Sequence, residues 1–156
     1  MRLQRLLGRT AAAAIGPWSS ESAAWLRVAS AEGHAVPTTV KVIQAKDFVR
    51  ANPEGHADMA KAEQLLKNIA GAGAGLEGFH VLVDTRRSTG ALSATELWSL
   101  AQQLAQYRHA FGRKTAILCP LARFDHSRFF ALCAENRGFD MRAFVSYEEA
   151  MEWLID

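Results

Sequence analysis

The sequence predicts an α/β domain in which a mainly parallel sheet of four or five strands is covered by about four helices. Short runs such as 79–83 and 115–119 are apolar along their whole length, which is typical of strands covered on both faces. Amphipathic segments with marked helix starts alternate with these runs. Such alternation favours right-handed crossovers and helices that cover a parallel sheet.

Length and composition indicate one globular domain. The chain has 156 residues, of which 49% are hydrophobic and 22% charged, as is ordinary for a soluble protein. Its net charge of +2 comes from the first 38 residues, because the rest of the chain has as many acidic as basic side chains. A neutral body lacks the positive field of a dedicated nucleic-acid binder. No apolar run reaches the ~18–20 residues that a membrane span needs.

Residues 1–37 are expected to form a basic extension that is poorly ordered or a leader, followed by the domain at 38–156. Residues 1–20 contain three arginines and no acidic residue. This composition resembles an organelle targeting peptide, and it also fits an unstructured extension or a start codon placed too far upstream. The segment 22–28 could form one helical run, and 29–39 predicts a linker.

The first part of the body contains a strand candidate, a turn and a helix. Val40–Ile43 predicts a short strand, and the Asn-Pro-Glu-Gly sequence at 52–55 predicts a turn. Asp58 can cap a helix whose apolar residues recur at three- and four-residue spacing until Gly71 ends it. The glycine-rich segment 71–75 predicts a flexible loop, because it lacks the preceding strand and following Lys-Ser/Thr of a phosphate-binding loop.

The best-specified helix start lies at Ser93. Ser93 and Glu96 form an S-x-x-E capping box, and Leu92 and Leu97 occupy the two positions of a hydrophobic staple. Apolar residues then recur on one face as far as Phe111. The pattern predicts one long amphipathic helix after the strand at 79–83.

The last part of the chain repeats the strand and helix pattern twice. After the strand at 115–119, Asp125 can cap a third helix. Met141–Val145 predicts the last strand. Ser146 and Glu149 predict a second capping box, which opens the final helix.

This order of elements, with a strand that ends in Asp84, a helix that opens at Ser93 and the ending EEAMEWL, resembles the STAS and anti-sigma-factor-antagonist superfamily. The closer likeness is to its uncharacterised, sporulation-antagonist-like bacterial branch, and it covers about residues 38–156. The resemblance implies a STAS-like fold and a cytoplasmic regulatory module that binds a protein partner such as a kinase.

The resemblance also implies a site of phosphorylation. In the family, a serine at the start of this helix is phosphorylated, which breaks the complex with the partner. The family pattern there is Asp-Ser-Ser-Gly, whereas residues 92–95 of this chain are Leu-Ser-Ala-Thr, so that only Ser93 matches. Ser93 is therefore a candidate for phosphorylation, and the alternative is that it serves only as a helix cap.

Two further groups of residues are candidates for binding. Trp98 and Phe130 could form an exposed partner surface, or they could belong to a wider buried face. A second group lies where strands end, at the edge where open α/β sheets bind ligands, and could hold an anion or a partner or could be a solvated basic loop. Its members are Arg86, Arg87, Ser88, Thr89 and Arg123.

The sequence predicts no catalytic, metal or cofactor site. Cys119 and His126 together suggest a thiol nucleophile, but no motif surrounds them, and a buried, inert thiol is favoured. Cys119 and Cys133 are predicted to be free core thiols in a reducing compartment. The five histidines lack the spacing of metal ligands, and no dinucleotide-binding or hydrolase motif is present.

These observations favour a non-enzymatic regulatory or protein-interaction module, with its partner bound near residues 86–93. A homodimer could form through an exposed helix or sheet edge. The alternative from another class is a carrier or sensor of a small apolar or anionic ligand, held between sheet and helices. In that case the loop at 71–75 could open the pocket.

Overall fold

The strands pair in the order β1-β2-β3-β5-β7-β8, and β3, β5, β7 and β8 run parallel to one another. Strands β1 and β2 extend this sheet with antiparallel pairs. The computed structural model describes residues 24–27, 39–43, 48–76 and 78–156. The strands of the sheet are β1 (Ala24–Arg27), β2 (Thr39–Ile43), β3 (Phe48–Asn52), β5 (His80–Asp84), β7 (Thr115–Leu118) and β8 (Met141–Phe144).

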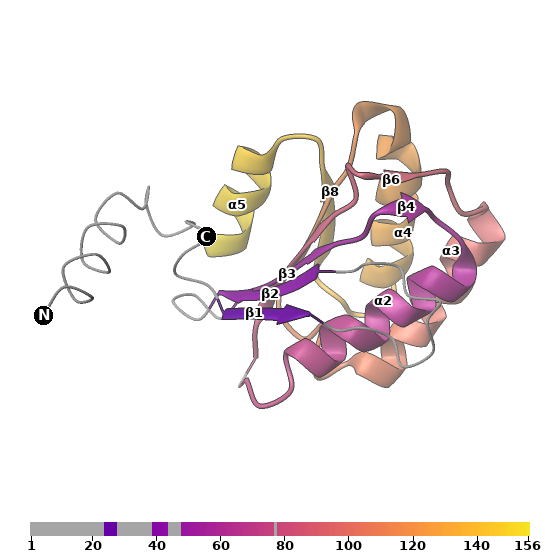
Figure 1. The fold of residues 1–156 in the computed structure, drawn as a ribbon. Coiled ribbons are helices and arrows are strands. Elements are labelled where there is room, and N and C mark those ends of the chain that lie inside the picture. The colour runs from indigo at the N-terminus through magenta and orange to yellow at the C-terminus, as the bar shows by residue number, and fades with distance from the viewer. Residues whose placement is uncertain (1–23, 28–38, 44–47, 77) are drawn as a thin grey trace, which may run out of the picture.

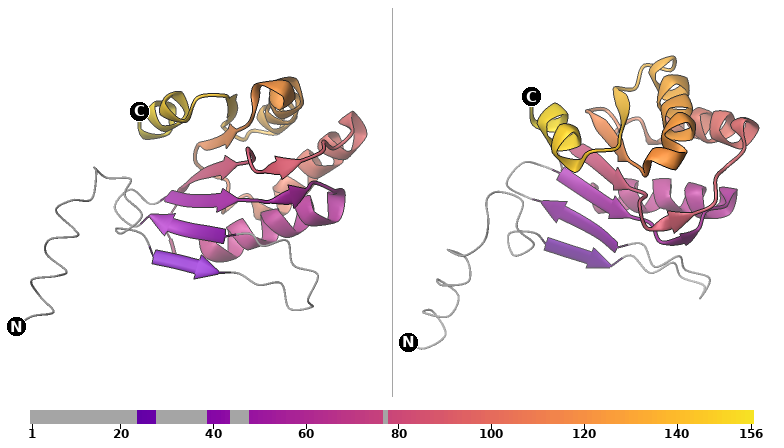
Figure 2. Two further views of the ribbon diagram at one scale, coloured as in Figure 1. Left: turned by 45° about the horizontal axis from the view of Figure 1, so that its top comes forward. Right: turned by 90° about the horizontal axis from the view of Figure 1, so that it is seen from above.

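Helices cover both faces of the sheet (Figures 1 and 2). The described helices are α2 (Met59–Ala72), α3 (Ala94–Gln103), α4 (Phe124–Glu135) and α5 (Tyr147–Ile155), with 3-10 turns η4 (Leu104–Tyr107) and η5 (Leu121–Arg123). Helices α2, α3 and α4 pack on one face, and α5 packs alone on the other. The predicted α/β class, with a mainly parallel sheet covered by helices, is confirmed. No described helix combines the length and the apolar character that a membrane crossing requires.

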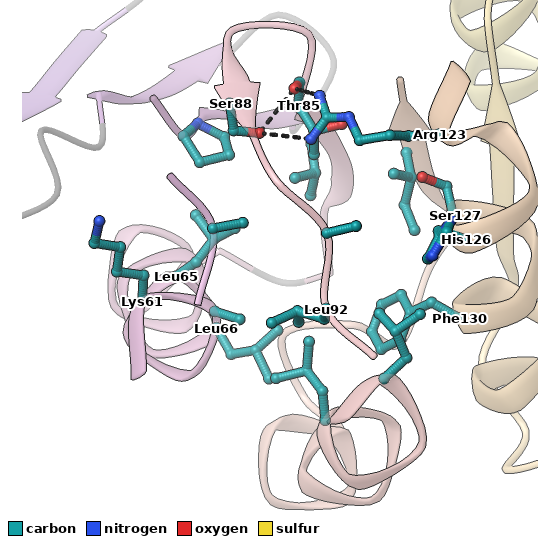
Figure 3. A pocket seen from close by; sticks show the side chains of 18 of the residues that line it. Lys61, Leu65, Leu66, Thr85, Ser88, Leu92, Arg123, His126, Ser127 and Phe130 are labelled. Carbon is teal, nitrogen blue, oxygen red and sulfur yellow. Dashed lines mark hydrogen bonds between the residues drawn. The ribbon is translucent and has the colours of Figure 1, made fainter. Parts of the chain in front are cut away.

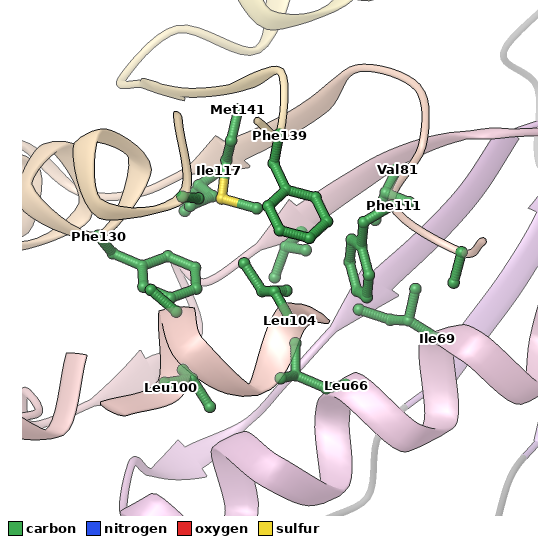
Figure 4. Close-up of a cluster of buried hydrophobic side chains, with 14 of the residues drawn as sticks. Leu66, Ile69, Val81, Leu100, Leu104, Phe111, Ile117, Phe130, Phe139 and Met141 are labelled. Carbon is green, nitrogen blue, oxygen red and sulfur yellow. The ribbon is translucent and has the colours of Figure 1, made fainter. Parts of the chain in front are cut away.

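The alternation of strand side chains divides the core into two clusters. Val81 and Val83 of β5 face α2, α3 and α4, whereas Leu82 between them faces α5. The larger cluster is shown in Figure 4, where side chains from the sheet, α2, α3 and α4 meet around Leu104, which is fully buried. Burial of β5 on both faces explains why its sequence is continuously apolar.

Three helix starts agree with their local signals. The Asp58 side chain accepts a hydrogen bond from the backbone N–H of Lys61 at 2.8 Å. Ser93 and Glu96 form the complete capping box at α3. Ser146 caps α5 by accepting from the N–H of Glu149 at 3.3 Å. These starts were predictable because cap and partner lie three residues apart.

Two elements near the beginning of the chain differ from the predictions. A helix was expected at 22–28, but residues 24–27 form β1, which lies within the segment expected to be an extension. Strand β3 was missed, because its polar Arg50 resembles turn or surface sequence. The Arg50 guanidinium is held by Asp84, 34 residues away, through a contact of 3.1 Å between Nη2 and Oδ2. The predicted boundary near Pro37 and the linker at 29–39 lie almost wholly outside the described residues.

Two helices also differ in their bounds. The helix predicted to run to Phe111 ends as an α-helix at Gln103 and tightens into the 3-10 turn η4. Helix α4 begins at Phe124, and Asp125, predicted as its cap, lies in its first turn. The cap position is held by Arg123, whose side chain makes no capping hydrogen bond. That side chain has partners elsewhere, which are described below.

Candidate functional site

A cavity of about 180 Å³ lies between the sheet and helices α2, α3 and α4. Its exposed lining residues, among them His56, Gly90 and His126, mark a mouth near the carboxyl ends of β3, β5 and β7. Apolar side chains line its walls, including Leu65, Leu66, Leu92 and Phe130 (Figure 3), and the lining continues inward to Phe111, Thr115 and Met141. The cavity therefore penetrates the larger of the two core clusters.

A two-stranded ribbon covers the mouth of the cavity. Strand β4 (Gly55–His56) pairs in parallel with β6 (Ser88–Thr89), and the N–H of Ala57 donates to the carbonyl of Thr89 at 2.8 Å. We call residues 85–92, which contain β6, the strap. At Gly90 of the strap φ is +73°, and an added Cβ would lie 2.5 Å from Cε1 of His56. The positive φ favours glycine there, and a larger residue would also have to displace the exposed His56 ring.

Arg123 fastens the strap from the opposite side of the mouth. Its Nη2 donates to the carbonyl oxygen of Thr85 at 2.6 Å, and its Nη1 lies 3.3 Å from the carbonyl oxygen of Gly90 and 3.4 Å from Oγ of Ser88. Figure 3 shows the Arg123 side chain reaching across the rim above the apolar walls. The guanidinium therefore forms part of the rim and also holds the strap in place.

The charges that line the cavity are paired with one exception. Glu54 binds Arg87 through a contact of 2.8 Å between Oε1 and Nη1. Asp58 lies 3.8 Å from the ammonium of Lys61, between Oδ2 and Nζ. No carboxylate among the described residues pairs with Arg123. The rim therefore has a positive charge whose hydrogen bonds are made to neutral oxygens only.

A buried hydroxyl lies among the lining residues at the inner end. Thr115, at the start of β7, is 2% exposed, and its Oγ1 has no hydrogen-bond partner among the described residues. Thr115 lies on the same face of β7 as Ile117, which also lines the cavity, because alternate residues of a strand share a face. Buried hydroxyl groups are rarely left without a partner.

The three arginines predicted to form one anion site have different surroundings. Arg86 binds Asp84, Arg87 binds Glu54, and Arg123 alone lines the cavity. Burial alone raises the pKa of the Asp84 carboxyl, but the hydrogen bonds and charge of Arg86 outweigh it, so that this pKa lies below its ordinary value. A combined anion site of Arg86, Arg87 and Arg123 stays a prediction, and two of these three arginines are paired with carboxylates.

Two polar residues of the predicted group lie in the strap. Ser88 is buried and its hydroxyl donates to the carbonyl of Thr85 at 2.8 Å. Thr89 is exposed, and its carbonyl accepts the hydrogen bond that joins the strap to Ala57. Both residues belong to the strap that covers the mouth, and Ser88 also lines the cavity.

Ser93 is exposed, and its hydroxyl is engaged in the capping box. The N–H of Glu96 donates to Oγ of Ser93 at 3.3 Å, while Oε2 of Glu96 accepts from the backbone N–H of Ser93 at 2.8 Å and from its hydroxyl at 2.9 Å. The two hydrogen bonds from Ser93 hold the pKa of the Glu96 carboxyl below its ordinary value. The structural role of Ser93 is thus shown, and its phosphorylation stays a prediction.

The two aromatic residues predicted as an exposed pair have different surroundings. Trp98 is 48% exposed, and the guanidinium carbon of Arg137 lies 5.4 Å from its ring centroid. Phe130 is buried at 9% exposure and lines the cavity. Its neighbour Phe129 faces outward instead. The expected exposed pair is therefore corrected, because the helix places position 130 toward the sheet.

The geometry of Cys119 argues against a thiol nucleophile. Cys119 is fully buried, and its Sγ lies 3.5 Å from the carbonyl oxygen of Phe144. Burial raises the pKa of its thiol, and Ser127 and the charge of Arg123 oppose this only in part. The described residues contain no group of three metal-binding side chains.

Some residues of the cavity were not singled out from the sequence. Lys61, His56 and Ser127 line the cavity, but the sequence around each of them predicts only a helix or a turn and no binding motif. Thr115 carried a weak signal, since it is the only polar residue of a strand that is buried along its whole length. The glycine-rich segment 71–75, expected to open a pocket, is not among the lining residues.

Comparison with family models and with curated proteins found no match. Among solved structures, the chain is similar to an uncharacterised protein with a SpoIIAA-like fold from Shewanella loihica, with 16% identity, a TM-score of 0.49 and coverage of 85% of this chain and 94% of that one. It is also similar to an anti-sigma factor antagonist from Mycobacterium paratuberculosis, with 14% identity, a TM-score of 0.48 and coverage of 83% and 100%.

Proposed function

We propose that this protein is a non-enzymatic carrier or sensor that binds one small, largely apolar molecule in the cavity between the sheet and helices α2, α3 and α4. The observation that carries the proposal is the cavity itself, which enters the core from a mouth beside the strap. Its volume is about 180 Å³, and apolar cavities of about 150 Å³ are known to take up benzene. A ligand of this size gains affinity mainly from apolar area removed from water.

The composition of the lining supports the same proposal. Most of the lining residues are apolar, and Thr115 is a buried polar residue among them. The lining thus combines broad apolar walls with few polar groups, as small-molecule sites do.

The ribbon of β4 and β6 supports a sensing role. The strap covers the mouth and is joined to the start of α4 by the hydrogen bonds from Arg123 to Thr85, Ser88 and Gly90. A ligand that favours one arrangement of the strap changes the outer surface presented by residues 85–92. In this way, binding of a ligand in the cavity changes the surface that a partner would contact, and no chemical reaction is needed.

The experiment is a titration of the full chain with 1-octanol, followed by NMR or calorimetry. Uptake is expected, and the variant Ala62→Leu is expected to reduce it strongly, because Ala62 lines the cavity. Ala60→Leu is the matched control, since Ala60 is exposed on the same helix and does not line the cavity. If the unmodified protein takes up no octanol, or if both variants behave alike, the proposal is wrong. Native mass spectrometry of the purified protein would further identify any small molecule that co-purifies.

A second candidate is binding of a protein partner at the start of α3, as the family resemblance implies. The specific observation is Trp98, a large aromatic side chain that is half exposed one turn after the exposed Ser93. Exposed aromatic residues are frequent anchors of protein interfaces. A pull-down from the native host with unmodified, Ser93→Ala, Ser93→Asp and Trp98→Ala baits tests this candidate. Identical partners for all four baits would contradict it.

A further inference from the structure

We propose that the cavity selects ligands with a carboxylate head, and that Arg123 is the residue that binds this head. This inference rests on the proposed function, because it names the class of molecule that the cavity takes up. The ligand would be a monocarboxylate with an apolar body of about eight carbon atoms, judged from cavity sizes. The apolar body would contact the walls, and the carboxylate would remain at the rim.

The balance of charge at the rim is the first argument. The lining acids Glu54 and Asp58 are each paired with a cation, and Arg123 is not paired with any described carboxylate. A guanidinium that borders an apolar cavity interacts more strongly with an anion than it would in water. One unpaired positive charge matches a single carboxylate better than a doubly charged phosphate monoester.

The hydrogen-bond capacity of Arg123 is the second argument. A guanidinium has five N–H donors. The described contacts use two N–H groups of Nη1, toward Ser88 and Gly90, and one of Nη2, toward Thr85. Nε and the second N–H of Nη2 have no acceptor among the described residues. These are donors that a carboxylate, which has two acceptor oxygens, can use while the strap remains fastened.

The position of Arg123 relative to the apolar walls is the third argument. In Figure 3 the guanidinium lies beside Thr85 and Ser88 on one side of the cavity, and the side chains of Leu66, Leu92 and Phe130 lie on the other side. Leu66 and Phe130 are buried, whereas Arg123 is partly exposed. A molecule whose carboxylate meets Arg123 therefore has its apolar part directed into the cavity.

The test compares octanoate with 1-octanol, which have eight carbon atoms each and differ in charge. The alkyl chain of octanoate is one carbon shorter, which works against the expected preference. The unmodified full chain is expected to bind octanoate at least about tenfold more tightly, since a hydrogen bond to a charged group contributes about 1.5–3 kcal/mol. Arg123→Gln is expected to remove this preference. Because the substitution also loosens the strap, the effect is measured as the ratio of the octanoate affinity to the octanol affinity in the same variant. Arg128→Gln is the matched control, because Arg128 is exposed on α4 and does not line the cavity.

The outcomes separate the two proposals. Equal affinity for octanoate and octanol, or unchanged octanoate affinity in Arg123→Gln, overturns the role of Arg123 and leaves the proposed function intact. Binding of neither molecule overturns the proposed function. If Arg123→Gln fails to fold, the salt dependence of the unmodified protein decides, because added NaCl should weaken binding of octanoate and not of octanol. Absence of that difference contradicts the proposal.

Discussion

Arg86 and Asp84 form a two-point ion pair, in which Nε donates to Oδ1 at 2.9 Å and Nη2 donates to Oδ2 at 2.8 Å. Arg50 of the neighbouring strand β3 adds a third contact to the same carboxylate. Asp84 thus joins β3 and β5 with the beginning of the strap. The pair also removes Arg86 from the set of cations that could bind a ligand at this edge of the sheet.

We expect Asp84→Ala to lower the free energy of unfolding by about 2 kcal/mol. The carboxylate side chain is 7% exposed, whereas Arg50 and Arg86 are partly hydrated, so that the loss is smaller than for a fully buried pair. Urea denaturation measures this loss. Asp140→Ala, at an exposed position, is the control and should change stability by less than about 0.5 kcal/mol. Equal losses of stability in the two variants would contradict a stabilising role for the ion pairs of Asp84.

The same carboxylate predicts a pH dependence of stability. Because the pKa of Asp84 is lower in the folded protein, its contribution is fully present above the unfolded pKa of about 3.9. The contribution is lost as the pH falls through the lower folded value. Denaturation at pH 7 and at successively lower pH should therefore show a difference between the unmodified protein and Asp84→Asn that shrinks in acid. A constant difference would argue against a lowered pKa.

Removal of the α3 cap has a predictable cost. Ser93→Ala deletes the hydroxyl that accepts from the N–H of Glu96, and it should destabilise the protein by about 1 kcal/mol. Ser93→Asp, which can still cap the helix, should retain most of the stability. Thermal and urea denaturation of the two variants provide the comparison. If Ser93→Asp is as unstable as Ser93→Ala, the capping account is incomplete.

Two glycines at the end of α2, Gly71 in its last turn and Gly73 at its C-cap, should respond in opposite directions. A Cβ at Gly73 would lie 1.9 Å from Cζ of Phe79, a buried ring, so that Gly73→Ala should destabilise the fold by about 1–3 kcal/mol. A Cβ at Gly71 would meet nothing within 4 Å, and Gly71→Ala within the helix should add about 0.5–1 kcal/mol. Chemical denaturation of both variants gives the sign of each change, and two changes of the same sign would be inconsistent with this packing.

Both cysteines should resist alkylation in the folded protein. Cys119 is fully buried and the pKa of its thiol is raised, while Cys133 is buried in the core cluster. Because the thiolate is the reactive form, iodoacetamide at neutral pH should modify either thiol only at the rate of opening or unfolding. Mass spectrometry with and without urea measures this. Rapid modification of Cys119 in the native state would reopen the question of a reactive thiol.

Much of the fold follows from local sequence. The caps at Asp58, Ser93 and Ser146 could be predicted because each side chain finds its partner three residues away. The strands β5 and β7 were found because burial on both faces demands continuous apolar residues. The strand β8 was also predicted, although it lies at the sheet edge and its Arg142 is exposed. Strand β3 was missed for the opposite reason, since it contains the charged residue Arg50, whose ion pair is made with a carboxylate 34 residues away.

The sequence by itself determined the α/β class, the main helix starts and the position of the strap, because these depend on periodicity and on contacts within one turn. Tertiary structure alone decided which arginine is paired and which is not. Arg86 meets Asp84 two residues away, but Arg123 meets Thr85 across 38 residues, and that distance in the chain gives no local pattern. The inward position of Phe130 and the cavity it lines likewise arise only when three helices pack against one face of the sheet.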